Sequence, residues 1–410
     1  MKLNSIATKF SNICRVRRKF QIIIFVANLL PNHLFGITLN NDMYRINDLN
    51  ENIVIGKEKV LLQLKVESTD DINNSNLNNE NSTFIKSKND SSLSGYSLKL
   101  IEGSDTTLID QNNPGSLGIS HGFECGQVFL YKKNYHMFIT EKVTSKDFGV
   151  DLTSTGHWKS SDGISWVRVS TLQNSIKTSK NPKHAIWSPM PVYDKSKECW
   201  NIFYVGYEEG VTNPHGRVFK AYSKTKGYNG LDGPYIDETD TVLSYYNTNK
   251  KIWEGKQGAD SFYPFQVGRK WYGFYGSSDA ASYWDVGLAT ANSLSGPWTR
   301  DTKLDPVFTY CENPIVTTLR DKVKFCVYDD LAHGISDCHS IGYGYSIDGV
   351  HWVQKYLSIP MPKWAACIRT PLSFIYEGNG IYIIYFTALT PDEYNGFEKV
   401  GRIKVKLVKN

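Results

Sequence analysis

From residue 96 to the C-terminus, short runs rich in Tyr, Phe, Trp, Val and Ile alternate with turns rich in Gly, Asn and Asp. β-branched and aromatic runs bounded by such turns are typical of β-strands. No stretch of useful length places apolar residues at the spacing of an amphipathic helix. The pattern therefore predicts that residues 96–410 are all-β.

One hairpin pattern recurs five times in this region. Each copy has a polar or charged residue, an apolar strand, a turn and a Tyr/Phe-rich strand; the copies are 124–140, 187–207, 260–277, 312–329 and 369–387. Their starts are 63, 73, 52 and 57 residues apart. Most are followed by a Gly-containing turn and an aromatic residue, as in Ser160–Trp166 and Ser346–Trp352. Repeats of this period predict a five-bladed β-propeller, and an irregular β-sandwich with coincidental turns is the alternative.

The N-terminal 36 residues have the pattern of a secretory signal. A basic stretch at 15–19 precedes an apolar run at 20–30, and Gly36 is a small residue suited to cleavage. The run is too short to span a bilayer comfortably. We therefore expect a signal peptide over residues 1–36 and a secreted or secretory-pathway protein. An uncleaved signal anchor, which would place the protein at a membrane, is the alternative.

Residues 37–95 are expected to form an extension and a low-complexity linker. Residues 51–66 alternate loosely and predict one strand, whereas residues 71–92 hold seven Asn and five Ser. Such a composition cannot bury enough apolar surface to offset the entropy of ordering, so we expect a disordered linker there. Three N-glycosylation sequons, at Asn73, Asn81 and Asn89, fall inside it and suggest a glycoprotein.

Composition limits the class of partner. The chain has 410 residues, 40% hydrophobic and 13% aromatic, and a formal net charge of +5. Six basic residues and no acidic ones lie in residues 1–36, which leaves a net charge of about −1 on the rest. A near-neutral body argues against nucleic acid or a polybasic membrane surface as the main partner. We expect a monomer.

The chain has seven cysteines, of which Cys14 lies in the leader. The others are Cys125, Cys199, Cys311, Cys326, Cys338 and Cys367, and none forms a C-x-x-C pair. That spacing argues against a zinc or thioredoxin-type motif. An even count in a secreted chain predicts up to three disulfides, with buried free thiols as the alternative.

The blades of a propeller converge on a central channel, so the residue that opens each hairpin is expected to face it. These residues are Glu124, Trp187, Asp260, Glu312 and Arg369. Carboxylates gathered in one pocket push their pKa values apart and so separate an acid from a base. His121, His184 and His333 are also expected near channel ends, as metal or substrate ligands or as ordinary hydrogen-bonded side chains.

Three segments in this order resemble the five-bladed propeller glycosidases, in particular glycoside hydrolase family 43 and its relatives. They are Ile186-Trp187-Ser188-Pro189, Ala259-Asp260-Ser261-Phe262 and Glu312-Asn313-Pro314. The resemblance implies that Glu312 is the general acid, that Asp260 tunes it, and that the carboxylate opening the first blade is the base. That residue is Glu124 where the family has Asp, and Cys125 follows it where the family has Pro. Glu102, Asp105 and Asp110 are rival bases.

The resemblance implies hydrolysis of O-glycosidic bonds, with arabinan or xylan side chains among the candidate substrates. Inversion requires about 6.5–9.5 Å between acid and base, and about 5 Å would favour retention. Trp187, Phe262, Arg369 and His121 are the expected substrate-binding residues. No cofactor is expected, and a structural Ca²⁺ in the central channel is left open, because oxygen ligands leave little trace in a sequence. A carbohydrate-binding propeller without turnover and a protein-interaction propeller are the other hypotheses.

Overall fold

The computed structural model describes residues 95–410 apart from short gaps, together with five short strands before residue 62. The gaps are 147–148, 179, 210–213, 245–252, 279–283, 302–305, 332–339, 358, 360–362 and 391–395. The chain divides into two compact units, Met1–Asp90 and Ser91–Asn410. In the parts of the chain that are described, no helix has the length and apolar character needed to cross a membrane.

The first unit contains two small antiparallel sheets. β1 (Ile23–Ile24), β2 (Gly36–Leu39) and β3 (Asp42–Arg45) form one sheet, and β4 (Asn52–Ile55) pairs with β5 (Glu58–Leu61). The expectation of one strand over 51–66 is therefore wrong, because the segment turns back and pairs with itself. The linker at 71–92 and its three sequons lie outside the described residues.

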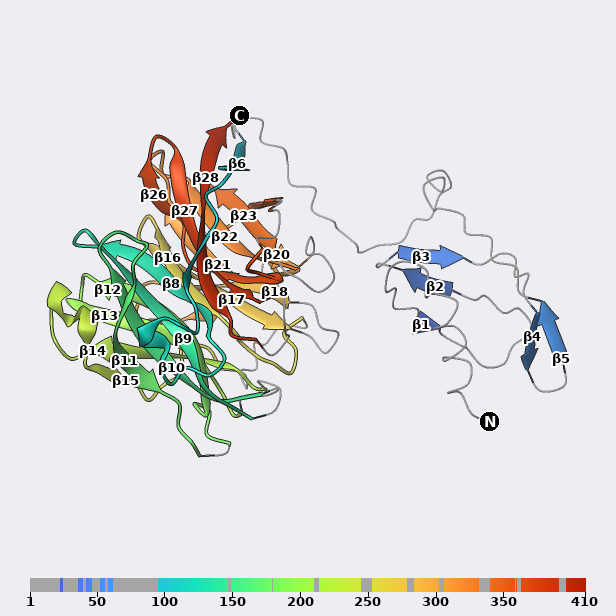
Figure 1. The fold of residues 1–410 in the computed structure, drawn as a ribbon, viewed down its shortest axis with the longest axis horizontal. Helices are drawn as coiled ribbons and strands as arrows, with labels where there is room; N and C mark the ends of the chain where they lie inside the picture. Colours follow the sequence, from blue (N-terminus) through green and yellow to red (C-terminus); the bar gives the residue numbers. More distant parts are fainter. Residues whose placement is uncertain are drawn as a thin grey trace. The chain divides into compact units, whose positions relative to one another are not determined.

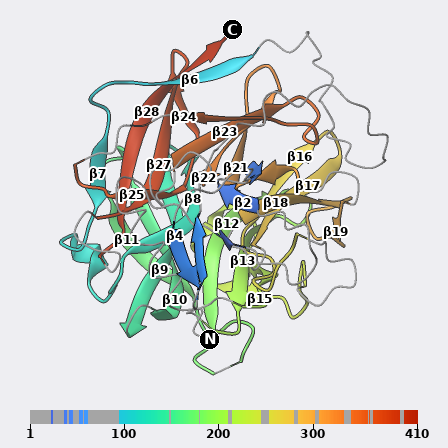
Figure 2. The ribbon, with the colours of Figure 1, turned by 90° about the vertical axis from the view of Figure 1, so that its right-hand side faces the viewer.

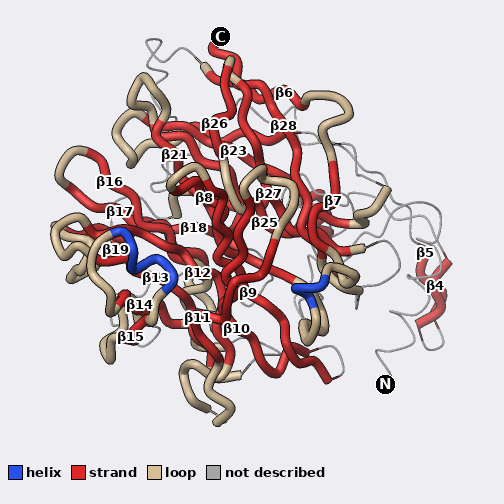
Figure 3. The backbone as a smooth tube through the Cα atoms, turned by 60° about the vertical axis from the view of Figure 1, so that its left-hand side comes forward, coloured by secondary structure: helices blue, strands red, loops and turns tan. Residues whose placement is uncertain are grey.

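The second unit is a five-bladed β-propeller. Its sheets follow one another around the body in sequence order, as the change of colour from green to red shows (Figure 2). The five predicted hairpins are confirmed, each as the inner pair of strands of one blade. Strands dominate the unit, and the helical segments described are two short 3₁₀ turns, Pro114–Ser116 and Tyr228–Asp232 (Figure 3).

Four blades are formed by consecutive strands. Blade 1 contains β8 (Phe123–Tyr131), β9 (Asn134–Lys146), β10 (Gly149–Ser160) and β11 (Val167–Asn174). Blade 2 contains β12 (Ala185–Asp194), β13 (Cys199–Tyr207), β14 (Arg217–Ser223) and β15 (Tyr235–Asp237). Blade 3 contains β16 (Phe262–Val267), β17 (Lys270–Ser278), β18 (Trp284–Ala291) and β19 (Thr299–Arg300), with β20 (Phe308–Thr309) also paired to β18. Blade 4 contains β21 (Cys311–Thr318), β22 (Lys324–Asp330), β23 (Ser340–Ser346) and β24 (Val353–Leu357).

The fifth blade joins the two ends of the unit. Its strands β25 (Cys367–Pro371), β27 (Ile381–Leu389) and β28 (Lys399–Lys409) are completed by β6 (Tyr96–Leu100), which pairs with β28 (Figure 1). β7 (Thr106–Ile109) also pairs with β28, and β26 (Ile375–Gly378) pairs with β27. This pairing closes the ring, which protects the edges that an open sheet would expose.

Position within a blade decides how apolar a strand is. In β13 every residue is buried, because neighbouring strands pair with both of its edges and other blades pack on its faces. In β11, the edge strand of blade 1, no residue is buried and exposed positions alternate with partly buried ones over most of its length. The largest apolar cluster draws its members from all blades except the first, and two smaller clusters pack blade 1 against blades 5 and 2.

The Gly-containing turn is stabilised in the same way in two of its copies, Ser160–Trp166 and Ser346–Trp352. Asp162 Oδ1 accepts hydrogen bonds from the backbone N–H groups of Ile164 and Ser165, at 2.7 Å each. Asp348 Oδ1 accepts the equivalent bonds from Val350 and His351, at 2.8 Å each. Each Asp side chain satisfies donors that the tight turn leaves unpaired, which fixes the connection between two strands of a blade.

Four cysteines, Cys125, Cys199, Cys311 and Cys326, are buried free thiols. The sequence allowed up to three disulfides, and these four unpaired thiols rule out that upper limit. Cys367 is buried as well, and Cys338 lies outside the described residues. In a large β core a thiol packs as a small apolar side chain, so the number of cysteines alone does not indicate pairing.

Candidate active site

Irregular pairing marks the beginning of four of the five inner strands. The register with the neighbouring strand shifts after Glu124 in β8, after Trp187 in β12, after Glu312 in β21 and after Ile368 in β25. In the first three, the next residue has a left-handed φ: 53° at Cys125, 55° at Ser188 and 52° at Asn313. Non-glycine residues seldom adopt this conformation, and bulges of this kind re-aim the neighbouring side chains. A bulge therefore re-aims the side chains at three of the predicted channel positions, Glu124, Trp187 and Glu312.

The three predicted catalytic carboxylates lie around one thiol. Burial raises the pKa of Cys125 well above its usual value, and the negative charges of Glu124, Asp260 and Glu312 raise it further. The Cys125 Sγ lies 3.6 Å from Thr370 Oγ1, which brings blade 5 to the same place. Acidic residues from blades 1, 3 and 4 thus act electrostatically on one buried thiol.

Glu124 is held between two cations. Its Oε2 lies 2.7 Å from Lys142 Nζ, and its Oε1 accepts a hydrogen bond from Arg369 Nη2. Burial alone would raise the pKa of Glu124, but the charges of Arg369 and Lys142 outweigh burial and lower it to about 2. Glu124 is therefore ionised throughout the ordinary pH range, and both of its oxygens are engaged.

Lys142 continues this network to Glu398, which precedes β28. The Lys142 Nζ lies 2.5 Å from Glu398 Oε1, and both side chains are buried. Burial, partly offset by Lys142, raises the pKa of Glu398. The other oxygen, Glu398 Oε2, is buried and accepts no hydrogen bond from the described residues. The Lys142 ammonium also lies 5.7 Å from the centre of the Trp187 ring, a cation–π contact that brings Trp187 into the same network.

Asp260 has the opposite electrostatic character from Glu124. The buried Tyr207 hydroxyl donates a hydrogen bond to its Oδ1. Burial raises the pKa of Asp260 to about 6, the Tyr207 bond opposes this, and the charge of Glu124 adds to it. Two of the three central carboxylates thus have pKa values about four units apart.

Glu312 and Asp329 form a paired position on β21 and β22. Glu312 is 6% exposed and accepts a 3.3 Å hydrogen bond at Oε2 from the Asn313 side chain. Asp329 is fully buried, and burial raises its pKa well above the usual value. Arg369 interacts electrostatically with Glu124, Glu312, Glu398 and Asp329, which together raise its pKa despite burial. Arg369 is thus the common counter-ion of these carboxylates.

The other predicted binding residues differ in their burial and in their contacts with this network. Trp187 is 7% exposed, and its Nε1 has no hydrogen-bond partner in the described structure. His121 joins the network through its backbone, because its carbonyl accepts from Glu398 N–H at 3.1 Å. Phe262 is fully buried, with its ring 5.0 Å from that of Trp298, so its expected contact with substrate is wrong. His184 is partly buried with Nδ1 unpaired within the described residues, and His333 lies outside them.

Several participants were missed by the sequence interpretation. Lys142, Glu398, Tyr207 and Asp329 do not open a hairpin, so the rule that selected the first residue of each repeat passed over them. The rival bases Asp105 and Asp110 have other local contacts: Asp105 accepts from Trp364 Nε1 at 3.3 Å, and Asp110 accepts from the backbone of Asn112. Among the described residues, no group of three or more His, Cys, Asp or Glu side chains is arranged to hold a metal ion.

No protein-family model and no curated protein sequence matches the chain. Solved structures do resemble it in fold. A family 117 glycoside hydrolase from Zobellia galactanivorans is 17% identical with a TM-score of 0.55, over 77% of this chain and 91% of that one. A glycosyl hydrolase from Bacteroides ovatus is 12% identical with a TM-score of 0.52, over 75% and 90% of the two chains.

The catalytic domain of a family 62 α-L-arabinofuranosidase from Coprinopsis cinerea is 13% identical with a TM-score of 0.50, over 73% of this chain and 95% of that one. At such identities the similarity establishes the fold. The matched length, about three quarters of this chain, is comparable with the extent of the propeller, and each relative is covered almost completely.

Proposed function

We propose that this chain is a glycoside hydrolase whose active site is the acidic centre of the propeller. The observation that carries the proposal is the gathering of Glu124, Asp260 and Glu312 around Cys125, with the pKa values of Glu124 and Asp260 displaced in opposite directions. Hydrolysis of a glycoside needs one carboxyl group that can give a proton and another that remains ionised. Glycoside hydrolases among the structures of similar fold support the same conclusion.

In the proposed reaction Glu312 gives its proton to the leaving oxygen as the glycosidic bond breaks. Glu124, ionised and held in place by Lys142 and Arg369, orients the attacking water and accepts its proton on the opposite face of the sugar. The configuration at the anomeric carbon is then inverted. The negative charge of Glu124 also stabilises the positive charge that develops on the sugar ring. Asp260 sets the field around the acid and, with Trp187 and Arg369, contributes to substrate binding.

The charges of the site favour a substrate without acidic groups. Five carboxyl groups surround two cations, because Glu124, Asp260, Glu312, Asp329 and Glu398 share Lys142 and Arg369. A uronic acid would add a further negative charge to this buried set. We therefore propose a neutral oligo- or polysaccharide, with arabinofuranosides tested first because one relative of similar fold is an α-L-arabinofuranosidase. Secretion, proposed from the leader, fits such a substrate.

One observation favours a second candidate, a carbohydrate-binding propeller without turnover. Both oxygens of Glu124 are engaged by cations, and a carboxylate with a pKa of about 2 is a weak base. A site of this kind would retain Trp187 and Arg369 for binding but would not activate water.

A product assay separates the two candidates. The full chain is incubated with 4-nitrophenyl α-L-arabinofuranoside, 4-nitrophenyl β-D-xyloside, arabinan and arabinoxylan, and the first anomer of the released sugar is followed by ¹H NMR. Glycosidase function predicts release with inversion. Release from arabinan and arabinoxylan should be strongly reduced in Glu312→Gln and retained in Glu377→Gln, a control that changes a surface carboxylate paired with Lys404. Saturable binding without any release would favour the second candidate instead.

A further inference from the structure

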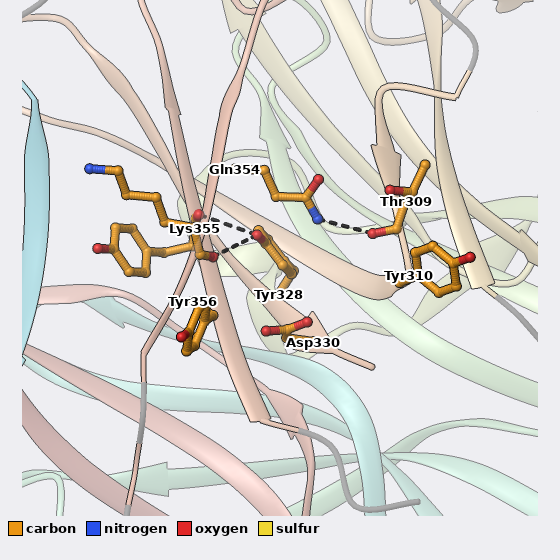
Figure 4. Close-up of a pocket in the computed structure, with 8 residues that line it drawn as sticks. Thr309, Tyr310, Tyr328, Asp330, Gln354, Lys355 and Tyr356 are labelled. Carbon is orange, nitrogen blue, oxygen red and sulfur yellow. Dashed lines mark hydrogen bonds between the residues drawn. The ribbon is translucent and has the colours of Figure 1, made fainter. Parts of the chain in front are cut away.

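A second hollow lies in blade 4, and one of its walls is β22, the strand that also carries Asp329 of the acidic site. Its volume is about 500 Å³, within the range of about 300–1,000 Å³ that is usual for ligand pockets. The walls come from β20, β22, β23 and β24 and from Tyr310 (Figure 4). The lining residues are Thr309, Tyr310, Tyr328, Asp330, Tyr343, Gln354, Lys355 and Tyr356.

Two glycines of β23 leave room for side chains that pack beneath this pocket. Gly344 of β23 pairs with Gln354 of β24, and Gly342 pairs with Tyr356. Because paired residues project to the same face of a sheet, the face that carries Gln354 and Tyr356 has no side chain from β23 at these two positions. A Cβ at Gly342 would lie 1.9 Å from Cε2 of Tyr328, so the Tyr328 ring lies directly over this glycine.

The Tyr328 ring is fixed in that position. Its hydroxyl lies 2.7 Å from the Lys355 carbonyl oxygen and 3.3 Å from that of Tyr343, and both contacts are drawn in Figure 4. The polar end of Tyr328 is therefore satisfied by backbone, and its buried ring forms a rigid surface beneath the pocket.

Two further tyrosines stand on opposite sides of this surface. Tyr310 lies on one side and Tyr356 on the other, with the Asp330 carboxylate between them (Figure 4). Tyr356 is 51% exposed, although large apolar surfaces are normally buried. Gln354 is held across the pocket by a 3.0 Å bond from its Nε2 to the Thr309 carbonyl.

Hydrogen-bonding capacity accompanies the aromatic rings. Asp330 is 2% exposed and accepts a 3.3 Å bond from Ser340 Oγ at Oδ2, whereas the side chain of Gln354 is exposed. The Lys355 ammonium donates to the Tyr96 carbonyl at 3.0 Å and is directed away from the pocket. The pocket thus combines aromatic rings with a polar amide, and no cation among its described lining residues points into it.

We propose that this pocket is an accessory carbohydrate-binding site that holds one neutral sugar unit of the polysaccharide on which the central site acts. A sugar ring has C–H faces that pack on aromatic rings and hydroxyl groups that form hydrogen bonds with amide side chains, which matches Tyr310, Tyr356 and Gln354. The identity of the ligand as a sugar rests on the proposed function. An anionic ligand is disfavoured, because Asp330 would oppose it.

The proposal is tested by affinity gel electrophoresis of the full chain in soluble arabinoxylan and arabinan. All proteins carry Glu312→Gln, so that the polysaccharide is not degraded. We expect Tyr356→Ala and Gln354→Ala to weaken binding about five- to tenfold, since one aromatic contact contributes on the order of 1 kcal/mol. Tyr376→Ala, which removes a 39% exposed tyrosine of blade 5, is the matched control and should bind as the parent does.

A kinetic comparison with Glu312 intact separates this site from the central one. Tyr356→Ala should raise KM for the polysaccharide about five- to tenfold and leave kcat/KM for the 4-nitrophenyl glycoside unchanged. Parent-like retardation of Tyr356→Ala and Gln354→Ala, or no retardation of the parent, would overturn the accessory site. If the wild-type chain hydrolyses nothing, the proposed function fails, while the gel still decides whether the pocket binds a glycan. If Tyr356→Ala does not fold, the exposed Gln354→Ala decides.

Discussion

The substitution Glu124→Gln removes one negative charge from between two buried cations while keeping the size of the side chain. The surroundings of Glu124 lower its pKa from 4.5 to about 2. This change corresponds to about 3 kcal/mol of preference for the ionised form, at 1.36 kcal/mol for each pKa unit. Because Gln resembles the protonated form, we expect the substitution to lower the free energy of unfolding by about 3 kcal/mol at pH 7.

The effect has a defined pH dependence. A carboxylate whose folded-state pKa is lowered stabilises the protein above the unfolded-state value, and this stabilisation is lost as pH falls through the folded-state value. The difference between wild type and Glu124→Gln should therefore be constant above about pH 5 and shrink from pH 4.5 towards 2.

Urea unfolding, followed by tryptophan fluorescence between pH 3 and 8, measures this difference. Glu377→Gln is the control, since Glu377 pairs with Lys404 at 2.7 Å with both side chains about one third exposed. An exposed pair of this kind contributes about 0–1 kcal/mol. If Glu124→Gln costs no more than Glu377→Gln, or if its cost does not change below pH 4.5, Glu124 is not held as we describe.

Three further predictions concern other parts of the same unit. The wild-type protein should lose stability as pH rises from 4 to 7, because Asp260, with its pKa raised to about 6, becomes ionised in a buried position. Asp260→Asn should therefore gain up to about 3 kcal/mol relative to wild type over this range. A pH-independent difference in urea midpoint would contradict this. Gly156→Ala should destabilise the protein by about 2–4 kcal/mol, because the new Cβ would lie 2.0 Å from Glu141 Oε1, which Trp158 and Arg168 hold in place; an unchanged thermal midpoint would refute that packing. Cys125, Cys199, Cys311 and Cys326 should react with a thiol reagent only after unfolding, and mass spectrometry of labelled peptides would reveal any that reacts in the folded protein.

The fold was predictable because each blade repeats the same local pattern. Alternating aromatic strands and Gly-containing turns are encoded within about twenty residues, so five hairpins could be located without knowing how they associate. The geometry of a propeller, in which equivalent positions of the inner strands meet, led to Glu124, Asp260, Glu312 and Arg369 as candidates, and these side chains do interact electrostatically.

The second layer of the site was not predictable by the same rule. Lys142 lies on the second strand of the hairpin that begins with Glu124, at a position the rule did not select. Glu398 precedes the last strand, and only the closed ring brings it beside blade 1. Phe262 was misplaced because it lies two residues beyond Asp260, where the inner strand already enters the packing around Trp298. The cysteines were misinterpreted because number and spacing do not distinguish a buried thiol from a cystine.

The most direct test of the central claim is the dependence of hydrolysis by Glu312→Gln on the leaving group. Methanol is a poor leaving group, so hydrolysis of a methyl α-L-arabinofuranoside needs a proton at the leaving oxygen. 2,4-Dinitrophenolate departs from its glycoside without being protonated. We predict that the substitution lowers kcat/KM about 10²–10⁴-fold for the methyl glycoside and only slightly for the dinitrophenyl one. Equal losses on both substrates, or none on either, would contradict the role of Glu312 as general acid at the centre of this propeller.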